Sequence, residues 1–380
     1  MSGGFVLPIR DDLVGQESYG APQLDVAARL NVNENPFDLP DDLAEAMGRA
    51  VAEAAISLNR YPDRDATDLR LALAEYVARE AGAPVDVSQV WAANGSNEVM
   101  HQLFLAFGGP GRLAITFDPT YSMYPEYARD TFTEFATYSR TEDFAVDIPV
   151  ALAAIAERRP SIVVVTSPNN PTGTALPIQD LTTLAEGARL AGAMLIVDEA
   201  YAEFRHDGVP SAVSLLADHP NMVVTRTMSK AFALAGARLG YCVAADPAVV
   251  STLMVVRLPY HLSAVTQAVA RTALAHADVL QAQVALLRRE RDSLAAWLVE
   301  EGLRVSPSDA NFLLFGTFPD RDEVWRGLLA RDVLVRQTGP EGWLRVSIGT
   351  PEENDRFRSA LRDVLGADHE GQGRREDDRS

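Results

Sequence analysis

The sequence has 380 residues, 47% of them hydrophobic, which is enough for two hydrophobic cores. Its net charge of −19, from 53 acidic and 34 basic residues, disfavours a polyanionic partner such as nucleic acid. A single cysteine, Cys242, excludes an internal disulfide. The sequence contains neither a signal-peptide pattern nor an apolar run long enough for a membrane helix, so we expect a cytoplasmic protein with no membrane partner.

The first part of the chain, residues 1–44, is rich in Pro, Asn and Asp. We expect it to form an arm that contributes to a smaller domain. From residue 45 to 260, short apolar runs alternate with helical patterns such as 177–192, which Pro177 can begin and Gly192 can end. The runs lie at residues 112–117, 161–166, 193–198, 221–227 and 238–244. This alternation is typical of a buried, largely parallel sheet, and it predicts a large α/β domain.

The pattern changes in residues 261–366. A long amphipathic helix at about 274–302 precedes strand-like segments, "ANFLLF" and "WLRVSIG", and a last helix at 351–365. These elements predict a smaller α+β domain. The tail, residues 367–380, is charged and almost without apolar residues, so we expect it to be disordered.

Chemically suggestive residues follow the predicted strands. Ligands of open α/β sheets bind at the carboxyl ends of the strands. Gly95, Ser96 and Asn97 lie where a helix begins, and free N–H groups there can bind phosphate. Asn170 lies in the turn "SPNNPTG", and Asp198 ends a strand. Each also has an ordinary interpretation, as a helix cap or a chain reversal.

Lys230 is the only lysine in the sequence, and it lies in "TMSKAFALAGARLG" with Thr227, Ser229 and Arg238. Only a primary amine forms a Schiff base with an aldehyde, and arginine cannot replace it because the guanidinium stays protonated. The hydroxyls and Arg238 suit a phosphate, and Asp198 suits a protonated pyridine nitrogen. Together these residues predict a site for pyridoxal 5′-phosphate (PLP), with no metal.

The sequence also resembles the fold-type I PLP aminotransferases, and within them the histidinol-phosphate aminotransferases, from about Asn31 to Leu365. The motifs that carry the resemblance are "NENP" (33–36), "RYPD" (60–63), "NGSNE" (94–98), "DPTYSMY" (118–124), "SPNNPTG" (167–173), "VDEAY" (197–201), "TMSKAFALAGARLGY" (227–241), "ANFLLF" (310–315) and "LRVSIGTPEEND" (344–355). The resemblance implies a large domain with a mostly parallel seven-stranded sheet and a smaller α+β domain. It also implies a homodimer with shared active sites.

The resemblance implies a role for each matching residue. Lys230 would bind the cofactor covalently and move the substrate's Cα proton, and Asp198 would pair with the pyridine nitrogen. Asn170 and Tyr201 would hydrogen-bond the 3-oxygen of PLP. Tyr121 would stack on its ring. The phosphate would be held by Gly95, Ser96, Asn97, Thr227, Ser229, Arg238 and, from the partner subunit, Tyr61.

Two arginines bear on the substrate. Arg345 matches the family's arginine for the substrate's anionic group, and Arg336 matches a second arginine of the subfamily. Such a pair suits both a phosphate and the dicarboxylate glutamate. We also expect Asn33 and Asn35 of "NENP" to contact substrate. The implied reaction transfers the amino group of glutamate to imidazole-acetol phosphate, giving histidinol phosphate and 2-oxoglutarate in histidine biosynthesis.

Three other functions fit the same cofactor motifs. One is an aminotransferase for aromatic amino acids, and another is a threonine-phosphate decarboxylase. The third is a PLP-sensing transcription regulator, which would carry a DNA-binding domain ahead of this part. The sequence disfavours the regulator, because only about thirty residues precede "NVNENP" and the net charge is strongly acidic.

Overall fold

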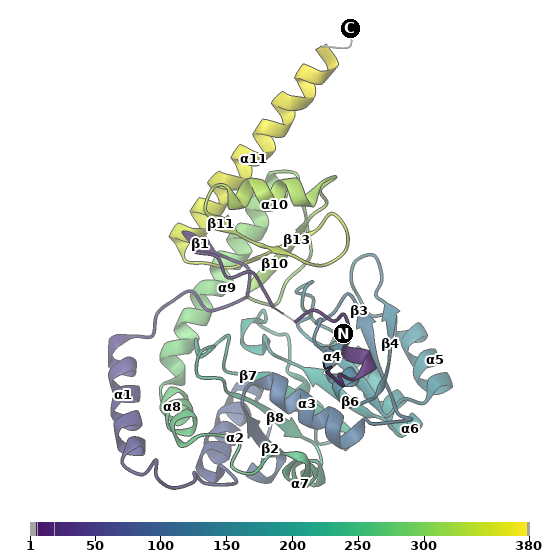
Figure 1. Ribbon diagram of the computed structural model, residues 1–380, viewed down its shortest axis with the longest axis vertical. Helices are drawn as coiled ribbons and strands as arrows, with labels where there is room; N and C mark the ends of the chain where they lie inside the picture. The colour runs from purple at the N-terminus through teal and green to yellow at the C-terminus, as the bar shows by residue number, and fades with distance from the viewer. Residues whose placement is uncertain (1–4, 6, 19, 378–380) are drawn as a thin grey trace.

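The computed structural model describes residues 5, 7–18 and 20–377, which form a large and a small unit (Figure 1). A seven-stranded sheet is the centre of the large unit, with the strand order β2-β8-β7-β6-β5-β3-β4. The strands are β2 (Val90–Ala93), β3 (Leu113–Asp118), β4 (Glu134–Ser139), β5 (Ile162–Thr166), β6 (Met194–Asp198), β7 (Met222–Thr227) and β8 (Gly240–Ala244). Only β8 runs antiparallel to its neighbours, β2 and β7. The mostly parallel sheet is therefore confirmed.

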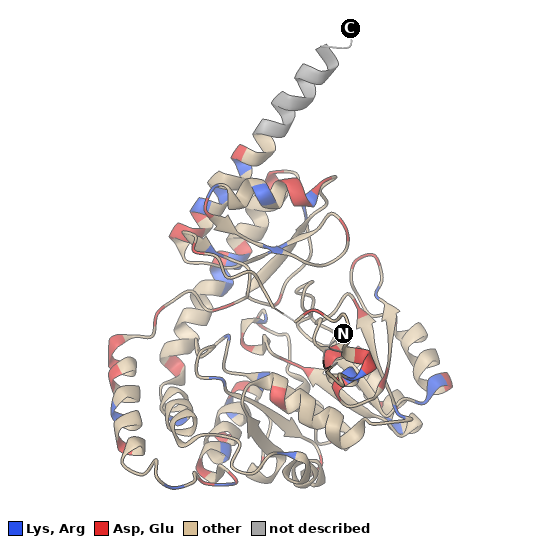
Figure 2. Cartoon of the chain, in the orientation of Figure 1, with Lys and Arg blue, Asp and Glu red and all other residues tan. Residues whose placement is uncertain are grey.

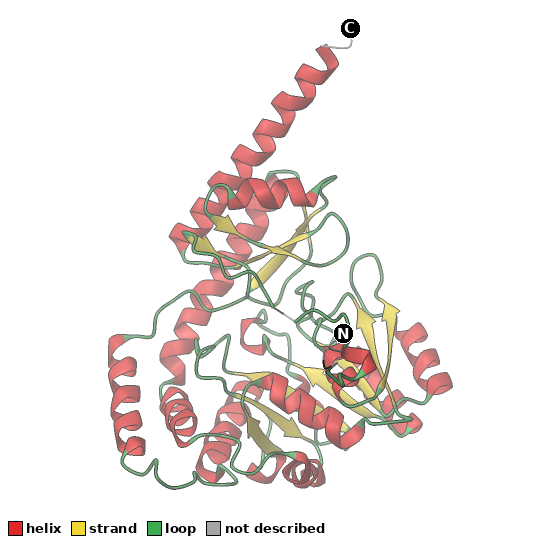
Figure 3. Ribbon diagram, viewed as in Figure 1, coloured by secondary structure: helices red, strands yellow, loops and turns green. Residues whose placement is uncertain are grey.

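Helices cover both faces of this sheet (Figure 3). The helices of the large unit are α1 (Asp41–Ala55), α2 (Thr67–Ala81), α3 (Ser96–Phe107), α4 (Tyr124–Asp130), α5 (Ile148–Arg158), α6 (Ile178–Ala191), α7 (Pro247–Val256) and α8 (Ala264–Ala275). Alternate strand residues face opposite helix layers, since side chains alternate along a strand. Ile196 and Val223 pack with α3, α4 and α7, whereas Val197 and Val224 pack with α2, α5 and α6. Both faces are buried, which explains the continuous apolar runs.

The predicted helix at 177–192 is confirmed as α6, with Pro177 as its N-cap and Gly192 as its C-cap. Gly192 has a φ of 77°, a left-handed conformation that favours glycine. The five predicted strands correspond to β3, β5, β6, β7 and β8.

The small unit contains two sheets. A four-stranded antiparallel sheet has the order β12-β13-β10-β9, and β1 pairs in parallel with β11. These elements are β1 (Ala28–Arg29), β9 (Arg304–Val305), β10 (Phe312–Gly316), β11 (Val333–Leu334), β12 (Arg336–Gln337), β13 (Leu344–Ser347), α9 (Ala277–Glu300), α10 (Arg321–Leu329) and α11 (Pro351–Asp377). Through β1, the N-terminal arm becomes part of this unit, over three hundred residues away in sequence.

Two details differ from the expectations. The helix α11 continues past residue 365 to Asp377, into the segment expected to be disordered, and 378–380 lie outside the described residues. A helix can extend into a polar segment because its backbone hydrogen bonds lie within it. The helix α8 packs against α1 and α2, on the large-unit side of the boundary expected at residue 261. No helix in the described part of the chain is both long and apolar enough to span a membrane.

Candidate active site

A cavity of about 420 Å³ lies at the carboxyl ends of β5, β6 and β7, where the two units meet. It is lined by Ala21, Val32, Asn33, Glu34, Ser96, Asn97, Tyr121, Thr166, Asn170, Asp198, Ala200, Tyr201, Thr227, Ser229, Lys230, Ala235, Gly236, Arg238 and Arg336. Most of the residues predicted from sequence are therefore brought together. They come from strand ends that a parallel sheet places along one edge.

Lys230 reaches the cavity from the loop that follows β7. Its Nζ donates a hydrogen bond to the carbonyl oxygen of Val32 in the N-terminal arm, at 2.9 Å. Removal of the amine from water lowers the pKa of Lys230 to about 8, and the positive charges of Arg345 and Arg238 act in the same direction, whereas Glu34 opposes them. A substantial fraction of this amine is therefore neutral and nucleophilic near physiological pH.

Asp198, at the end of β6, is buried and held by three hydrogen bonds. Its Oδ2 accepts from the hydroxyl of Tyr124 at 2.9 Å. Its Oδ1 accepts from the hydroxyl of Thr225 and from the backbone N–H of Ala200, both at 3.2 Å. Burial raises the pKa of Asp198, although these hydrogen bonds oppose the shift. A buried carboxylate in this position can form a charge-assisted hydrogen bond with a protonated ring nitrogen.

A group of hydroxyls and one guanidinium lies at another side of the cavity, beside the start of α3. Thr227 Oγ1 and Ser229 Oγ are 3.0 Å apart, and Arg238 Nη1 donates to Ser229 Oγ at 3.3 Å. Gly95 precedes the first turn of α3 with a φ of 84°. A Cβ at Gly95 would lie 2.7 Å from Arg238 Nη2, so any side chain at this position would displace the guanidinium group. Such a group of donors can hold a phosphate.

Asn170, Tyr201 and Tyr121 also line the cavity. The hydroxyl of Tyr201 accepts a hydrogen bond from Asn33 Nδ2 at 3.1 Å, so the arm is linked to the strand-end residues. Tyr121 packs edge-on against Tyr124, with ring centroids 5.6 Å apart.

The two arginines lie side by side in the small unit. Arg336 in β12 and Arg345 in β13 are directly opposite each other in the antiparallel pair. Arg345 is buried and donates to the side-chain oxygen of Asn170 and to the carbonyl oxygen of Asn31. Arg336 lines the cavity and donates to the carbonyl oxygen of Gly20 at 3.1 Å. Side chains directly opposite on one sheet face are close enough to bind one anion together.

Four of the residues predicted from sequence are not among those that line the cavity: Gly95, Arg345, Asn35 and Tyr61. Asn35 accepts a hydrogen bond from the N–H of Phe37, and its Nδ2 lies 3.4 Å from Gln283 Oε1. This local turn directs Asn35 away from the cavity. Of the two asparagines in "NENP", only Asn33 reaches the cavity. Tyr61 is 79% exposed and stacks on Tyr260, with ring centroids 4.4 Å apart.

Sequence reasoning missed Tyr124, Thr166 and Thr225. The hydroxyl of Tyr124 lies 2.6 Å from Thr166 Oγ1 and also contacts Asp198, so these residues form one hydrogen-bonded group. Tyr124 lies within "DPTYSMY", but its aromatic ring is equally typical of a core residue. Thr225 could have been found from strand alternation, because it lies two residues before Thr227 and shares its face.

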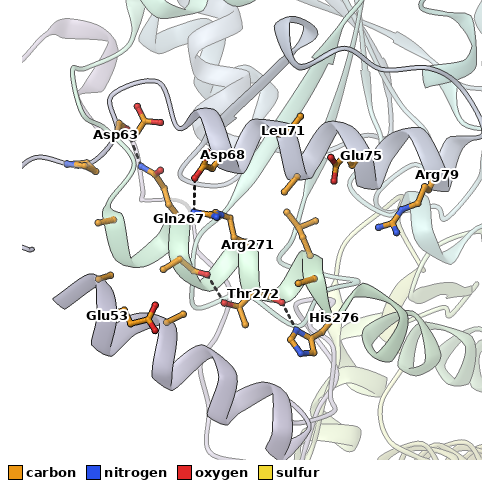
Figure 4. A pocket seen from close by; sticks show the side chains of 18 residues that line it. Glu53, Asp63, Asp68, Leu71, Glu75, Arg79, Gln267, Arg271, Thr272 and His276 are labelled. Atoms are coloured by element: carbon orange, nitrogen blue, oxygen red, sulfur yellow. Dashed lines mark hydrogen bonds and ion pairs between the residues drawn. The ribbon is translucent and has the colours of Figure 1, made fainter. Parts of the chain in front are cut away.

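A larger cavity, of about 1000 Å³, lies between α1, α2 and α8 (Figure 4). Asp68 and Arg271 form an ion pair of 3.1 Å in it, and His276, just after α8, bonds the carbonyl oxygen of Thr272 in α8. Its lining combines alanines with charged side chains and contains no lysine. We therefore assign the chemistry to the smaller cavity, which contains the only lysine.

Comparison with known proteins gives the family of this chain. The chain matches the model of the family "Aminotransferase class I and II" over residues 27–361. The histidinol-phosphate aminotransferase of Thermobifida fusca is 59% identical to it over 360 residues, which cover 95% of this chain and 96% of the relative. Histidinol-phosphate aminotransferase 3 of Burkholderia lata is 56% identical, with coverage of 94% and 96%.

Among solved structures, the histidinol-phosphate aminotransferase of Sinorhizobium meliloti in complex with pyridoxal-5′-phosphate has a TM-score of 0.78 to this chain. The two are 25% identical, and the match covers 90% of this chain and 92% of the other. The family match extends over the end of the arm, both units and all of the cavity-lining residues except Ala21. This chain belongs to the class I and II aminotransferases.

Proposed function

We propose that this protein is a PLP-dependent histidinol-phosphate aminotransferase. It would transfer an amino group between glutamate and imidazole-acetol phosphate, producing 2-oxoglutarate and histidinol phosphate for histidine biosynthesis. The observation that carries the proposal is the single lysine, whose buried amine shares one cavity with Asp198 and Arg336. The full-length similarity to histidinol-phosphate aminotransferases supports the choice of substrate.

The residues of the cavity fit PLP in number and chemistry. Lys230 offers the amine for the aldehyde and Asp198 an acid for the pyridine nitrogen. The hydroxyls of Ser96, Thr227 and Ser229, the guanidinium of Arg238 and the N–H groups at the start of α3 offer donors to the phosphate. When bound, PLP supplies an electron sink for the electrons left on the substrate's Cα after loss of its proton.

The protein's own residues would then position and move that proton. Lys230, once free of the cofactor, would take the proton from the substrate's Cα and deliver it to C4′ of PLP, and would reverse these steps in the second half of the reaction. Its lowered pKa suits this exchange, because a base with a pKa near the working pH both accepts and returns protons. Asn170 and Tyr201 would hydrogen-bond the 3-oxygen, and Tyr121 would stack on the ring.

The paired arginines would select the substrate. Histidinol phosphate has a phosphate and no carboxylate, whereas glutamate has two carboxylates, and a pair of guanidinium groups suits both. Arg345, already fixed by Asn170 and Asn31, would form the rigid part of the anion site. Arg336 would exchange the carbonyl oxygen of Gly20 for the substrate's anionic group. Asn33, which donates to the hydroxyl of Tyr201, would connect the arm to the cofactor's side of the cavity.

The most direct test mixes the PLP-loaded protein with histidinol phosphate, phenylalanine or threonine phosphate in parallel, without a 2-oxo acid. Histidinol phosphate should convert the yellow form of bound PLP to pyridoxamine phosphate fastest. Conversion by phenylalanine alone would instead identify an aromatic aminotransferase. Release of carbon dioxide from threonine phosphate would identify the decarboxylase.

We further propose a cytoplasmic homodimer in which Tyr61 reaches the phosphate of the partner's cofactor. Exposed apolar side chains lie on both segments joined by the Tyr61–Tyr260 stack, among them Ile56 (83% exposed), Leu58 (55%) and Leu258 (75%). Exposed apolar groups of this kind are typical of protein interfaces. Light scattering should give twice the chain mass of 41.2 kDa. A monomer with full activity would refute the shared site.

A further inference from the structure

Most charged residues of this protein lie on outer helices and loops (Figure 2). An exception is a group of five behind the active site, which we call the buried charge cluster: Glu80, Glu199, Glu203, Arg205 and Arg226. The side chain of Arg226 is 1% exposed and that of Glu199 is 2% exposed. Charges this deep are stable only when they are paired and hydrogen-bonded, so the cluster requires an explanation.

The centre of the cluster is the pair formed by Arg226 and Glu199. Both Nε and Nη2 of Arg226 bind Oε2 of Glu199, at 3.0 and 2.8 Å. Ser211 Oγ donates to the same carboxylate oxygen at 2.8 Å and accepts from Arg226 Nη2 at 2.8 Å. Glu199 Oε1 accepts from the N–H of Ala212 at 2.7 Å. The pair therefore joins the end of β6, the strand β7 and the loop at 211–212.

The other carboxylates extend the cluster to α2 and to the short helix after Tyr201. Arg226 Nη1 binds Glu80 of α2 at 2.7 Å, and Arg205 Nη2 binds the other oxygen of Glu80 at 2.8 Å. Glu203 lies 3.6 Å from Arg226 Nη1 and accepts from the hydroxyl of Tyr76 at 3.3 Å. Two arginines thus face three carboxylates.

Two parts of the chain that supply charges to this cluster, β7 and the end of β6, also supply residues to the active site. Side chains alternate along a strand, so Thr225 and Thr227 of β7 face the cavity side whereas Arg226 between them faces α2. In the same way Asp198 faces the cavity and its neighbour Glu199 faces the cluster. The residues Asp198 and Thr225 are also register partners in the sheet.

We propose that the pair of Arg226 and Glu199 is a positioning unit, which holds Asp198 and Thr227 in the places where they bind PLP. It fixes the ends of β6 and β7 relative to each other from the face opposite the cofactor, where no substrate competes for its hydrogen bonds. The inference rests on the proposed PLP site and adds two residues that do not touch the cofactor. In metal sites, residues that orient the direct ligands contribute about 10- to 100-fold to affinity or activity, and we expect an effect of that kind here.

The test compares wild type with Arg226→Met, Arg226→Lys and Ser211→Ala. The matched control is Arg70→Met, because Arg70 is also buried but donates to the carbonyl oxygens of Val87 and Val90, away from the cavity. For each protein, equilibrium dialysis gives the Kd of PLP. The ¹⁵N chemical shift of ring-labelled PLP reports whether the pyridine nitrogen is still protonated, which a loss of overall stability would not change.

In Arg226→Met we expect the Kd to rise about tenfold or more and the ¹⁵N signal to move toward that of an unprotonated pyridine. Arg226→Lys keeps the charge but loses the two-nitrogen contact, and Ser211→Ala loses one contact. In each of these two variants we therefore expect smaller changes in the Kd of PLP and in the ¹⁵N shift than in Arg226→Met. Arg70→Met should leave both at the wild-type values. If Arg226→Met does not fold, Arg226→Lys and Ser211→Ala decide the outcome by the same measurements.

Wild-type Kd and ¹⁵N shift in the folded variants, or an equal change in Arg70→Met, would overturn the positioning role. Failure of the wild-type protein to bind PLP would instead refute the proposed function, so the two failures are distinguishable.

Discussion

The two ends of the active-site cavity are built differently. At the cofactor end, Asp198 and Thr227 end neighbouring strands of one sheet, and Lys230 follows directly. At the anion end, Arg336 and Arg345 come from the small unit, and Arg336 is partly exposed and bound to the carbonyl oxygen of Gly20. The residues of the cofactor end are thus held by one buried sheet. The positions of the residues at the anion end depend instead on how the arm and the small unit pack against the large unit.

This difference suggests a division of labour. Groups on a continuous sheet are held in place by strand pairing, which suits chemistry that needs a fixed geometry. Groups on a second unit can exchange partners when an anion arrives, which suits selection of the substrate. Changes at the cofactor end should therefore abolish the reaction, and changes at the anion end should alter which substrate reacts.

The largest effect is expected for Lys230→Ala. Acid–base catalysis alone contributes about 10²- to 10⁴-fold, and this variant also loses covalent binding, so turnover should fall by at least about 10⁴-fold. Its visible absorbance with PLP should disappear. The matched variant Lys230→Arg keeps a positive charge but has no nucleophilic amine, so it should be equally inactive. Measurable turnover in Lys230→Arg would contradict the covalent role.

A smaller but still large effect is expected for Asp198→Asn. The change preserves shape but removes the charge opposite the pyridine nitrogen, and loss of one such stabilising group costs about 10²- to 10³-fold in kcat. Thr225→Val removes only a hydrogen bond that orients Asp198, so its effect should be smaller. Single-turnover rates with glutamate measure the effects of both substitutions. A wild-type rate in Asp198→Asn would refute the role of Asp198 in keeping the pyridine nitrogen protonated.

At the anion end, Arg345→Met and Arg336→Met should each lower kcat/KM by about 10- to 100-fold, because a hydrogen bond to a charged group contributes about 1.5–3 kcal/mol. The Kd of PLP should stay close to the wild-type value in both variants. Arg336→Met should affect histidinol phosphate more than phenylalanine. Equal losses for both substrates would mean that Arg336 does not select for phosphate.

The pKa of Lys230 links the two ends. Burial and then Arg345 lower it to about 8, so the amine loses its proton as the pH rises through about 8. The rate at which the PLP-free protein takes up PLP should therefore increase from pH 7 to 9 with a midpoint near 8, in stopped-flow absorbance. Arg345→Met removes a nearby positive charge, so the midpoint should move to higher pH. An unchanged midpoint would show that the two ends are electrostatically independent.

The smallest effect is expected behind the site, at Glu203. Burial raises the pKa of Glu203 to about 7, above the value of 4.5 for an unperturbed glutamate. The folded protein therefore holds a proton that the unfolded chain releases, and stability should fall as the pH rises from about 4.5 to 7.

Glu203→Gln should remove this dependence and raise stability at pH 8, by an amount on the order of 1 kcal/mol. Urea unfolding at several pH values measures it, with exposed Glu75→Gln as the control. A persistent slope between pH 5 and 7 in Glu203→Gln, or its loss in Glu75→Gln, would point to another group.

Several features were predictable because they depend on local sequence. Short apolar runs with helices between them predicted β3, β5, β6, β7 and β8. Polar residues at the ends of those runs were expected to lie together, since parallel strands align their carboxyl ends, and most of them line one cavity. The contacts of Asp198 were less predictable: Tyr124 reaches it from a helix 74 residues earlier, and an aromatic residue is as typical of a core as of a site.

The sequence alone determined that one lysine, in a turn of hydroxyl residues after a strand, must provide any side-chain Schiff base with an aldehyde, because no other side chain here is a primary amine. Only the tertiary structure decided that Arg336 and Arg345 face each other across two strands, that Asn33 but not Asn35 reaches the cavity, and that Arg226 supports it from behind. The physical reason is separation along the chain. Chemistry is a property of a single residue, whereas distance between residues is set by how the sheets and the arm pack.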